Sequence, residues 1–145
     1  MDRREAWCLQ SPRWYVRRMP DDVPRSLRAW FIAHFAACLC AAAPLFLAPQ
    51  GMLRMLGWIT VDPVSTRLVA AALFALGVRS FVARNESLER CRELLALEVI
   101  WSGAALAGLV VSALQGAAPL TWAFAGIFAI LTSVWIAYAV RLRAR

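Results

Sequence analysis

The chain has 145 residues, of which 61% are hydrophobic, and its mean hydropathy is +0.60. A soluble domain has roughly 45–50% apolar residues, so the composition indicates a membrane protein. The net charge of +7 comes from 16 arginines without any lysine. Because these arginines gather at the ends of apolar segments and do not line one soluble face, we expect no nucleic-acid partner.

Residues 1–28 form a polar tail that contains seven arginines. The tail is long for the basic region of a signal peptide and includes acidic residues, so we expect it to be retained. Trp7, Trp14 and Tyr15 lie among the arginines. This composition suits either adsorption to an anionic membrane surface or docking against another protein.

Four apolar runs predict transmembrane helices at residues 29–48, 64–82, 94–114 and 120–140. Each is close to the roughly 20 residues that cross a hydrocarbon core. Pro44 is expected to kink or loosen the outer end of the first helix. Asp62 and Pro63 form a helix-start signature before the second. The predicted fold is an all-α, polytopic four-helix bundle that runs up and down within residues 29–145.

The segment 52–59 lies between the first two spans and carries apolar side chains around much of its surface. We expect it to form a short helix that lies on the membrane or re-enters it. Trp58, at its end, is a candidate interfacial or partner-docking residue because tryptophan favours the membrane–water boundary.

Arginine distribution predicts the orientation. The tail, the connector after the second span and the C-terminus together hold 13 of the 16 arginines, whereas Arg54 and Arg67 lie on the other side. Under the positive-inside rule, the protein is expected in a bacterial inner membrane with both termini on the cytoplasmic side.

Three ionisable side chains, His34, Arg79 and Glu98, fall inside the predicted spans, where such groups are costly and usually face a partner or a wet cavity. Each lies five or six residues from a flanking arginine, which places all three roughly 7–9 Å inward. We expect Arg79 and Glu98 to form an ion pair, with His34 as a third member. The cluster either staples the helices together or forms a polar pocket in which His34 titrates. Tyr138 and Ser133 bracket the same level.

The remaining motifs identify no chemistry. Cys8, Cys38, Cys40 and Cys91 form no CxxC pair and have no accompanying histidine cluster, so neither a metal site nor a redox site is predicted. No nucleophile–base set, phosphate loop or haem-ligand spacing occurs, so no catalytic residue is assigned and the cofactor remains unknown.

Small residues recur four positions apart on three of the predicted spans, which lets helices approach closely in lipid. They could serve packing within the bundle, self-association or docking onto other subunits. The series are Ala33, Ala37 and Ala41; Gly103 and Ala107; Ala104, Gly108 and Ser112; and Ala125, Ala129 and Ser133.

The segments DPVSTRLVAAALFALGVRSFVARNES, LLALEVIWS and IFAILTSVWIAYAVRLR resemble a group of bacterial four-helix membrane proteins that are DoxX-like in size and layout. The resemblance implies the fold but no established reaction, and the N-terminal tail lies outside it. The leading functional hypothesis is a non-catalytic accessory or scaffolding subunit of a larger membrane complex, respiratory or photosynthetic, in contact with lipids and other subunits. The alternative is a small transporter or ligand-binding protein that uses His34, Arg79 and Glu98, and an enzyme is the third hypothesis.

Overall fold

Helices make up most of residues 23–143, the part of the chain that the computed structural model describes. The long ones are α1 (Arg25–Leu47), α3 (Pro63–Ala83), α4 (Leu88–Leu114) and α5 (Leu120–Arg143), and the short α2 (Pro49–Met55) follows α1. Residues 23–143 contain no strand. All four long helices are long and apolar enough to cross a bilayer. The predicted all-α membrane fold with four spans is therefore confirmed.

Local chemistry explains where the helices begin and end. The Asp62 carboxylate caps α3 by accepting hydrogen bonds from the backbone N–H groups of Val64 and Ser65, at 3.0 and 3.1 Å, and from the Ser65 hydroxyl. The Ser65 hydroxyl, with these N–H groups, holds the pKa of Asp62 below its ordinary value. Between α4 and α5, Gly116 has φ 87°, a left-handed conformation that glycine adopts without strain.

The observed helices differ in extent from the apolar runs. Helix α4 begins six residues earlier than position 94, at Leu88, and α1 begins at Arg25. Charged residues limit an apolar run but do not end a helix, because a helix continues beyond the hydrocarbon layer into the polar interface. The short helix lies at 49–55 instead of 52–59, since Pro49 is suited to a first helical position. Pro44 lies inside α1, and the turn that follows it remains helical.

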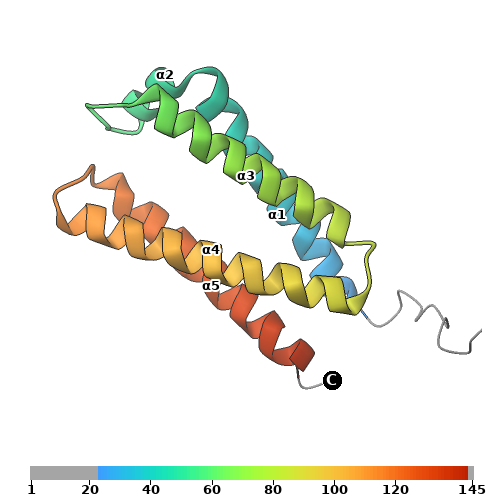
Figure 1. Ribbon diagram of the computed structural model, residues 1–145. Coiled ribbons are helices and arrows are strands. Elements are labelled where there is room, and N and C mark those ends of the chain that lie inside the picture. The colour runs from blue at the N-terminus through green and yellow to red at the C-terminus, as the bar shows by residue number, and fades with distance from the viewer. Residues whose placement is uncertain (1–22, 144–145) are drawn as a thin grey trace, which may run out of the picture.

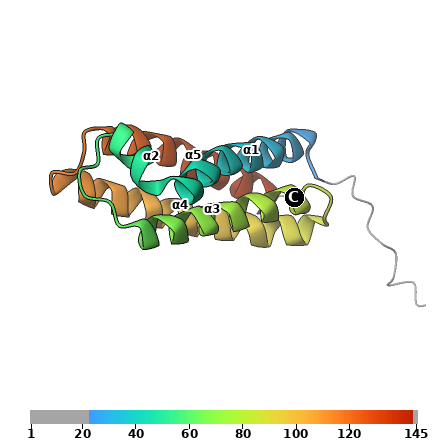
Figure 2. The same cartoon turned by 90° about the horizontal axis from the view of Figure 1, so that it is seen from above.

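The long helices form two closely packed pairs, α1 with α3 and α4 with α5. Figure 1 shows the pairs close together where α1 begins and α5 ends, and farther apart towards α2. Seen from above, α1 lies over α5 and α3 lies over α4 (Figure 2). We call the end that holds the start of α1, the α3–α4 connector and the end of α5 the arginine-rich end. Its described arginines are Arg25, Arg28, Arg84, Arg90, Arg92, Arg141 and Arg143.

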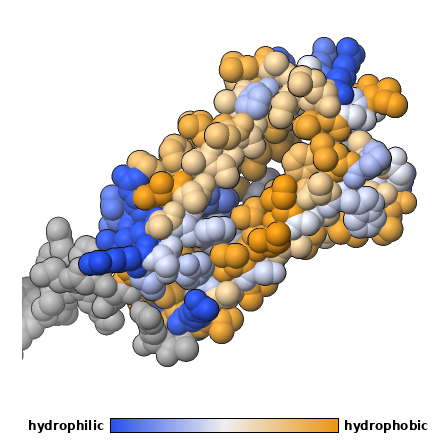
Figure 3. All heavy atoms as spheres, turned by 180° about the vertical axis from the view of Figure 1, so that it is seen from behind, coloured by the Kyte–Doolittle hydropathy of each residue, from blue (hydrophilic) through white to orange (hydrophobic). Residues whose placement is uncertain are grey.

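The main hydrophobic core lies towards the arginine-rich end. Trp135 of α5 is completely buried there, and its ring centroid lies 5.9 Å from those of both Trp30 and Phe31 of α1. Farther from this end, large side chains such as Leu68 and Leu114 are exposed, as expected of surfaces that face lipid. Figure 3 shows hydrophilic residues gathered at the two ends of a largely hydrophobic surface, which is hollowed between the helix pairs. The buried core residues are Val23, Leu27, Phe31, Ala83, Cys91, Leu94, Leu95, Trp135 and Leu142.

Gly77 marks the closest approach of α3 to α1. A Cβ atom built at Gly77 would lie 2.8 Å from the Cβ atom of Cys38, closer than side-chain carbons approach one another. The two helices can therefore pack at this distance only if residue 77 has no side chain.

We expect Gly77→Ala to destabilise the protein by ~1–3 kcal/mol, because the added methyl group forces α1 and α3 apart. Thermal unfolding in mild detergent, followed by tryptophan fluorescence, measures the effect. Gly108→Ala on α4 is the control, since a Cβ atom there meets nothing within 4 Å. Equal melting temperatures for the two variants would contradict the close packing at Gly77.

Candidate functional site

Three helices each contribute one polar side chain to a cluster inside the bundle. The Ser80 hydroxyl of α3 donates a hydrogen bond to Glu98 Oε1 of α4 at 2.9 Å. The same hydroxyl oxygen lies 3.0 Å from His34 Nδ1 of α1. His34 Nδ1 and Glu98 Oε1 are 3.6 Å apart. We call His34, Ser80 and Glu98 the polar cluster.

The polar cluster is almost entirely buried, with exposed fractions of 9% for His34, 0% for Ser80 and 1% for Glu98. The positions follow from helical periodicity, because each residue lies on a buried stripe of its helix. On α1 the stripe includes Phe31, His34 and Cys38. Polar groups are costly inside a bundle unless they are hydrogen-bonded, so the contacts within the cluster offset part of the cost of burying them.

Helix α5 completes the surroundings of the polar cluster through Trp135. The edge-to-face contact between the Trp135 and His34 rings has a centroid separation of 5.1 Å and an interplanar angle of 84°. The second ring nitrogen of His34, Nε2, lies 3.4 Å from Cys38 Sγ. All four long helices therefore contact the cluster or contribute to it.

The predicted ion pair between Arg79 and Glu98 is wrong. The Arg79 guanidinium instead donates a hydrogen bond to Glu86 Oε2 at 2.7 Å, and its side chain is 37% exposed. Residues 79 and 80 are about 100° apart around the helix axis, so only one of them can face the bundle interior. Because Gly77, Ser80 and Ala83 form the buried face of α3, Arg79 lies beside that face.

His34 and Glu98, which are predicted to lie at the same depth, are brought together in the structure. Ser80 and Trp135 are not among the predicted site residues, because serine and tryptophan are not conspicuous in a membrane span. The regular spacing of the small residues Gly77, Ser80 and Ala83 was the available signal for the face of α3 that turns inward.

The geometry at Ser80 allows two hydrogen-bond arrangements. A hydroxyl has one proton to donate, so when Ser80 donates to Glu98 Oε1 its oxygen accepts a hydrogen bond from the Nδ1–H group of His34. In the reverse arrangement a protonated Glu98 Oε1 donates to Ser80 Oγ, and Ser80 donates to His34 Nδ1. The two arrangements contain the same number of protons and differ in whether the imidazole or the carboxyl group holds the shared one.

Two buried polar atoms at this site have no hydrogen-bond partner among residues 23–143. They are Glu98 Oε2, an acceptor when the carboxyl group is ionised, and Trp135 Nε1, a donor. Unsatisfied buried groups are uncommon in proteins, and they mark where a proton or a polar ligand would be stabilised. Within the same residues, no group of three or more His, Cys, Asp or Glu side chains could hold a metal ion.

The other predicted site residues lie elsewhere. Trp58 is half-buried at the end opposite the arginine-rich end, with its ring centroid 6.0 Å from that of Phe124 on α5. Its role at the membrane interface stays a prediction. Trp7, Trp14 and Tyr15 lie outside the described residues.

Comparisons of the chain with protein families, with curated proteins and with solved structures found no match. The DoxX-like resemblance therefore stays an expectation.

We expect Ser80→Ala to lower stability by ~1–3 kcal/mol, because it leaves His34 Nδ1 and Glu98 Oε1 buried without their shared hydrogen-bond partner. Arg79→Gln removes only a partly exposed ion pair and should cost less than ~1 kcal/mol. Thermal unfolding of both variants in the same detergent measures the difference. A larger loss in Arg79→Gln would show that Arg79, and not Ser80, holds the helices together.

Proposed function

We propose that the protein is a small proton-handling membrane protein, of the transporter or ligand-binding class, that uses the polar cluster as its functional site. One observation carries the proposal: a single hydroxyl group bridges an imidazole and a carboxyl group in the buried interior. An imidazole and a carboxyl group that interact in one buried site titrate as a coupled pair, so a proton can pass from one to the other.

The proton step needs no group outside the polar cluster. His34 Nδ1 gives its proton to Ser80 Oγ as Ser80 gives its own proton to Glu98 Oε1. The doubly protonated imidazole becomes neutral, keeping the proton on Nε2, and the carboxylate becomes a neutral acid. Ser80 ends with one proton, as it began. A full exchange cycle then requires Glu98 to release its proton to a ligand or to water.

The position of the polar cluster links this proton transfer to the shape of the bundle. His34 and Ser80 belong to the α1–α3 pair, whereas Glu98 belongs to the α4–α5 pair. When the carboxylate and the imidazolium are both charged, they attract each other across the boundary between the pairs. Neutralisation removes that attraction and favours separation of the pairs. The unsatisfied Glu98 Oε2 and Trp135 Nε1 favour a small ligand with both a donor and an acceptor.

For the location, we propose the bacterial inner membrane with the arginine-rich end in the cytoplasm. Support comes from the 13 arginines of residues 1–28, 84–92 and 141–145. In this orientation the polar cluster lies nearer the cytoplasmic surface than the outer one.

The proton chemistry can be tested by infrared difference spectroscopy of the reconstituted protein between acid and alkaline pH. We expect a carbonyl band from the protonated Glu98 carboxyl group, absent from Glu98→Gln. Ser80→Ala and His34→Gln should shift the pH at which this band appears. Arg79→Gln is the matched control and should titrate like the parent. A parent spectrum identical to that of Glu98→Gln, or a band unaffected by Ser80→Ala and His34→Gln, would refute the proposal.

A second candidate function, an accessory or scaffolding subunit, is favoured by small residues that face outward. Ala33, Ala37 and Ala41 form an exposed stripe on α1 that packing within the described chain does not use. Ala104, Gly108 and Ser112 form a second exposed stripe on α4. Small residues on a lipid-facing surface let another helix approach closely.

If the protein is such a subunit, Ala37→Leu and Gly108→Leu should release an integral-membrane partner that co-purifies with the parent at a fixed ratio. Ala123→Leu, at an exposed position on α5 outside both stripes, should retain it. Mass analysis after purification in mild detergent gives the composition. Monomers without a partner would contradict this candidate, and so would a homo-oligomer lost on the same substitutions.

A further inference from the structure

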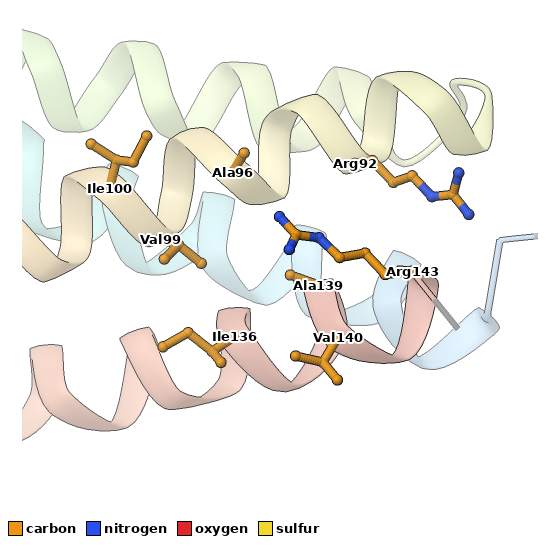
Figure 4. A pocket seen from close by; sticks show the side chains of 8 residues that line it. All are labelled: Arg92, Ala96, Val99, Ile100, Ile136, Ala139, Val140 and Arg143. Atoms are coloured by element: carbon orange, nitrogen blue, oxygen red, sulfur yellow. The ribbon is translucent and has the colours of Figure 1, made fainter. Parts of the chain in front are cut away.

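A groove on the outer surface between α4 and α5 combines an apolar wall with two arginines. It has a volume of about 430 Å³ and lies near the arginine-rich end. Figure 4 shows its apolar side chains between the two helices, with Arg92 and Arg143 towards the helix ends and the Arg143 guanidinium turned towards α4. The lining residues are Arg92, Ala96, Val99, Ile100, Ile136, Ala139, Val140 and Arg143.

The positive charge of this groove is not neutralised by the described chain. Within residues 23–143, neither Arg92 nor Arg143 forms an ion pair with a carboxylate. Glu86, in the nearby α3–α4 connector, forms ion pairs with Arg79 and Arg90. Arg92 donates a hydrogen bond to the backbone oxygen of Leu142, which fixes its side chain against the end of α5. The groove therefore carries two guanidinium groups without a carboxylate partner, that of Arg143 turned back over the groove and that of Arg92 at its rim, pointing towards the start of α4 (Figure 4).

The apolar wall of the groove, which extends from the arginines towards the middle of α4 and α5, belongs to the lipid-facing surface. Ile100 is 70% exposed and Val140 is 60% exposed, so hydrocarbon reaches the groove directly. From Arg92 to Ile100 the groove follows α4 for about 12 Å, at ~1.5 Å per residue. A chain of several methylene groups can lie along this length.

We propose that the groove binds an anionic phospholipid, with the phosphate held by Arg92 and Arg143 and an acyl chain lying between α4 and α5. Basic pockets at the ends of membrane helices attract anionic headgroups, and guanidinium groups suit phosphate oxygens. The apolar wall favours a lipid over free phosphate, which gains nothing from contact with Ala96 and Val99. A zwitterionic lipid binds less well, because its ammonium group is repelled by the two arginines.

Native mass spectrometry of protein purified from equimolar phosphatidylglycerol and phosphatidylcholine tests this inference. We expect the parent to retain phosphatidylglycerol preferentially. Arg143→Gln should reduce that preference about fivefold, which corresponds to ~1 kcal/mol for one basic residue near an anionic lipid. The double variant R92Q/R143Q should reduce it further. Because Arg143 makes no hydrogen bond or ion pair within residues 23–143, its single variant is expected to fold normally.

Controls separate this site from general electrostatic attraction. The double variant R25Q/R141Q removes the same charge at the same end from exposed positions outside the groove, and it should keep the parental preference. Ala96→Trp fills the groove without changing its charge and should weaken lipid retention. Equal losses in R25Q/R141Q and R92Q/R143Q would overturn the inference. Displacement of the lipid by inorganic phosphate, or full retention in Ala96→Trp, would overturn the acyl-chain contact.

Discussion

The shared hydrogen bonding of the Ser80 hydroxyl to His34 and Glu98 is the interaction on which the arrangement of the bundle most depends. Within each helix pair, apolar packing is close. Between the pairs, the polar cluster and the Trp135 contacts supply specific links near the arginine-rich end. Lipid is as apolar as the side chains of the bundle, so membrane helices associate through packing and hydrogen bonds instead of hydrophobic burial. The polar link between the pairs therefore adds to the packing of Trp135 in holding the pairs together.

The small residues of α3 serve both packing and polarity. Gly77 allows the backbone of α3 to approach Cys38 on α1, and Ser80, three residues later, faces the same helix. His34 lies one turn before Cys38, so the close approach at Gly77 also brings the serine hydroxyl within reach of the imidazole. A larger residue at position 77 would separate the helices and lengthen this hydrogen bond. The packing and the polar cluster are consequently one structural feature.

Much of this architecture could be predicted from the order of apolar and charged residues along the chain, because four long apolar runs leave few alternatives to four membrane helices. The depth of His34 and Glu98 could also be predicted, since a helix advances by a fixed rise per residue. The pairing of Arg79 could not, because depth does not determine which side of a helix faces inward. That side depends on the packing of small residues such as Gly77 against α1. Arg79 instead donates a hydrogen bond to Glu86 in the connector. Trp135 was missed because a lone tryptophan in a span gives no indication of its neighbours.

The division of the polar cluster between two helix pairs has a consequence for biogenesis. As the chain emerges from the ribosome, α1 and α3 are complete before α4 and α5 are made. The first hairpin can enter the bilayer with the imidazole of His34 already bonded to Ser80. Glu98 arrives later and has no hydrogen-bond partner on its own hairpin for its side-chain oxygens among the described residues. Its carboxyl group thus finds its partner only on the first hairpin, so this hydrogen bond forms only when the second hairpin docks against the first.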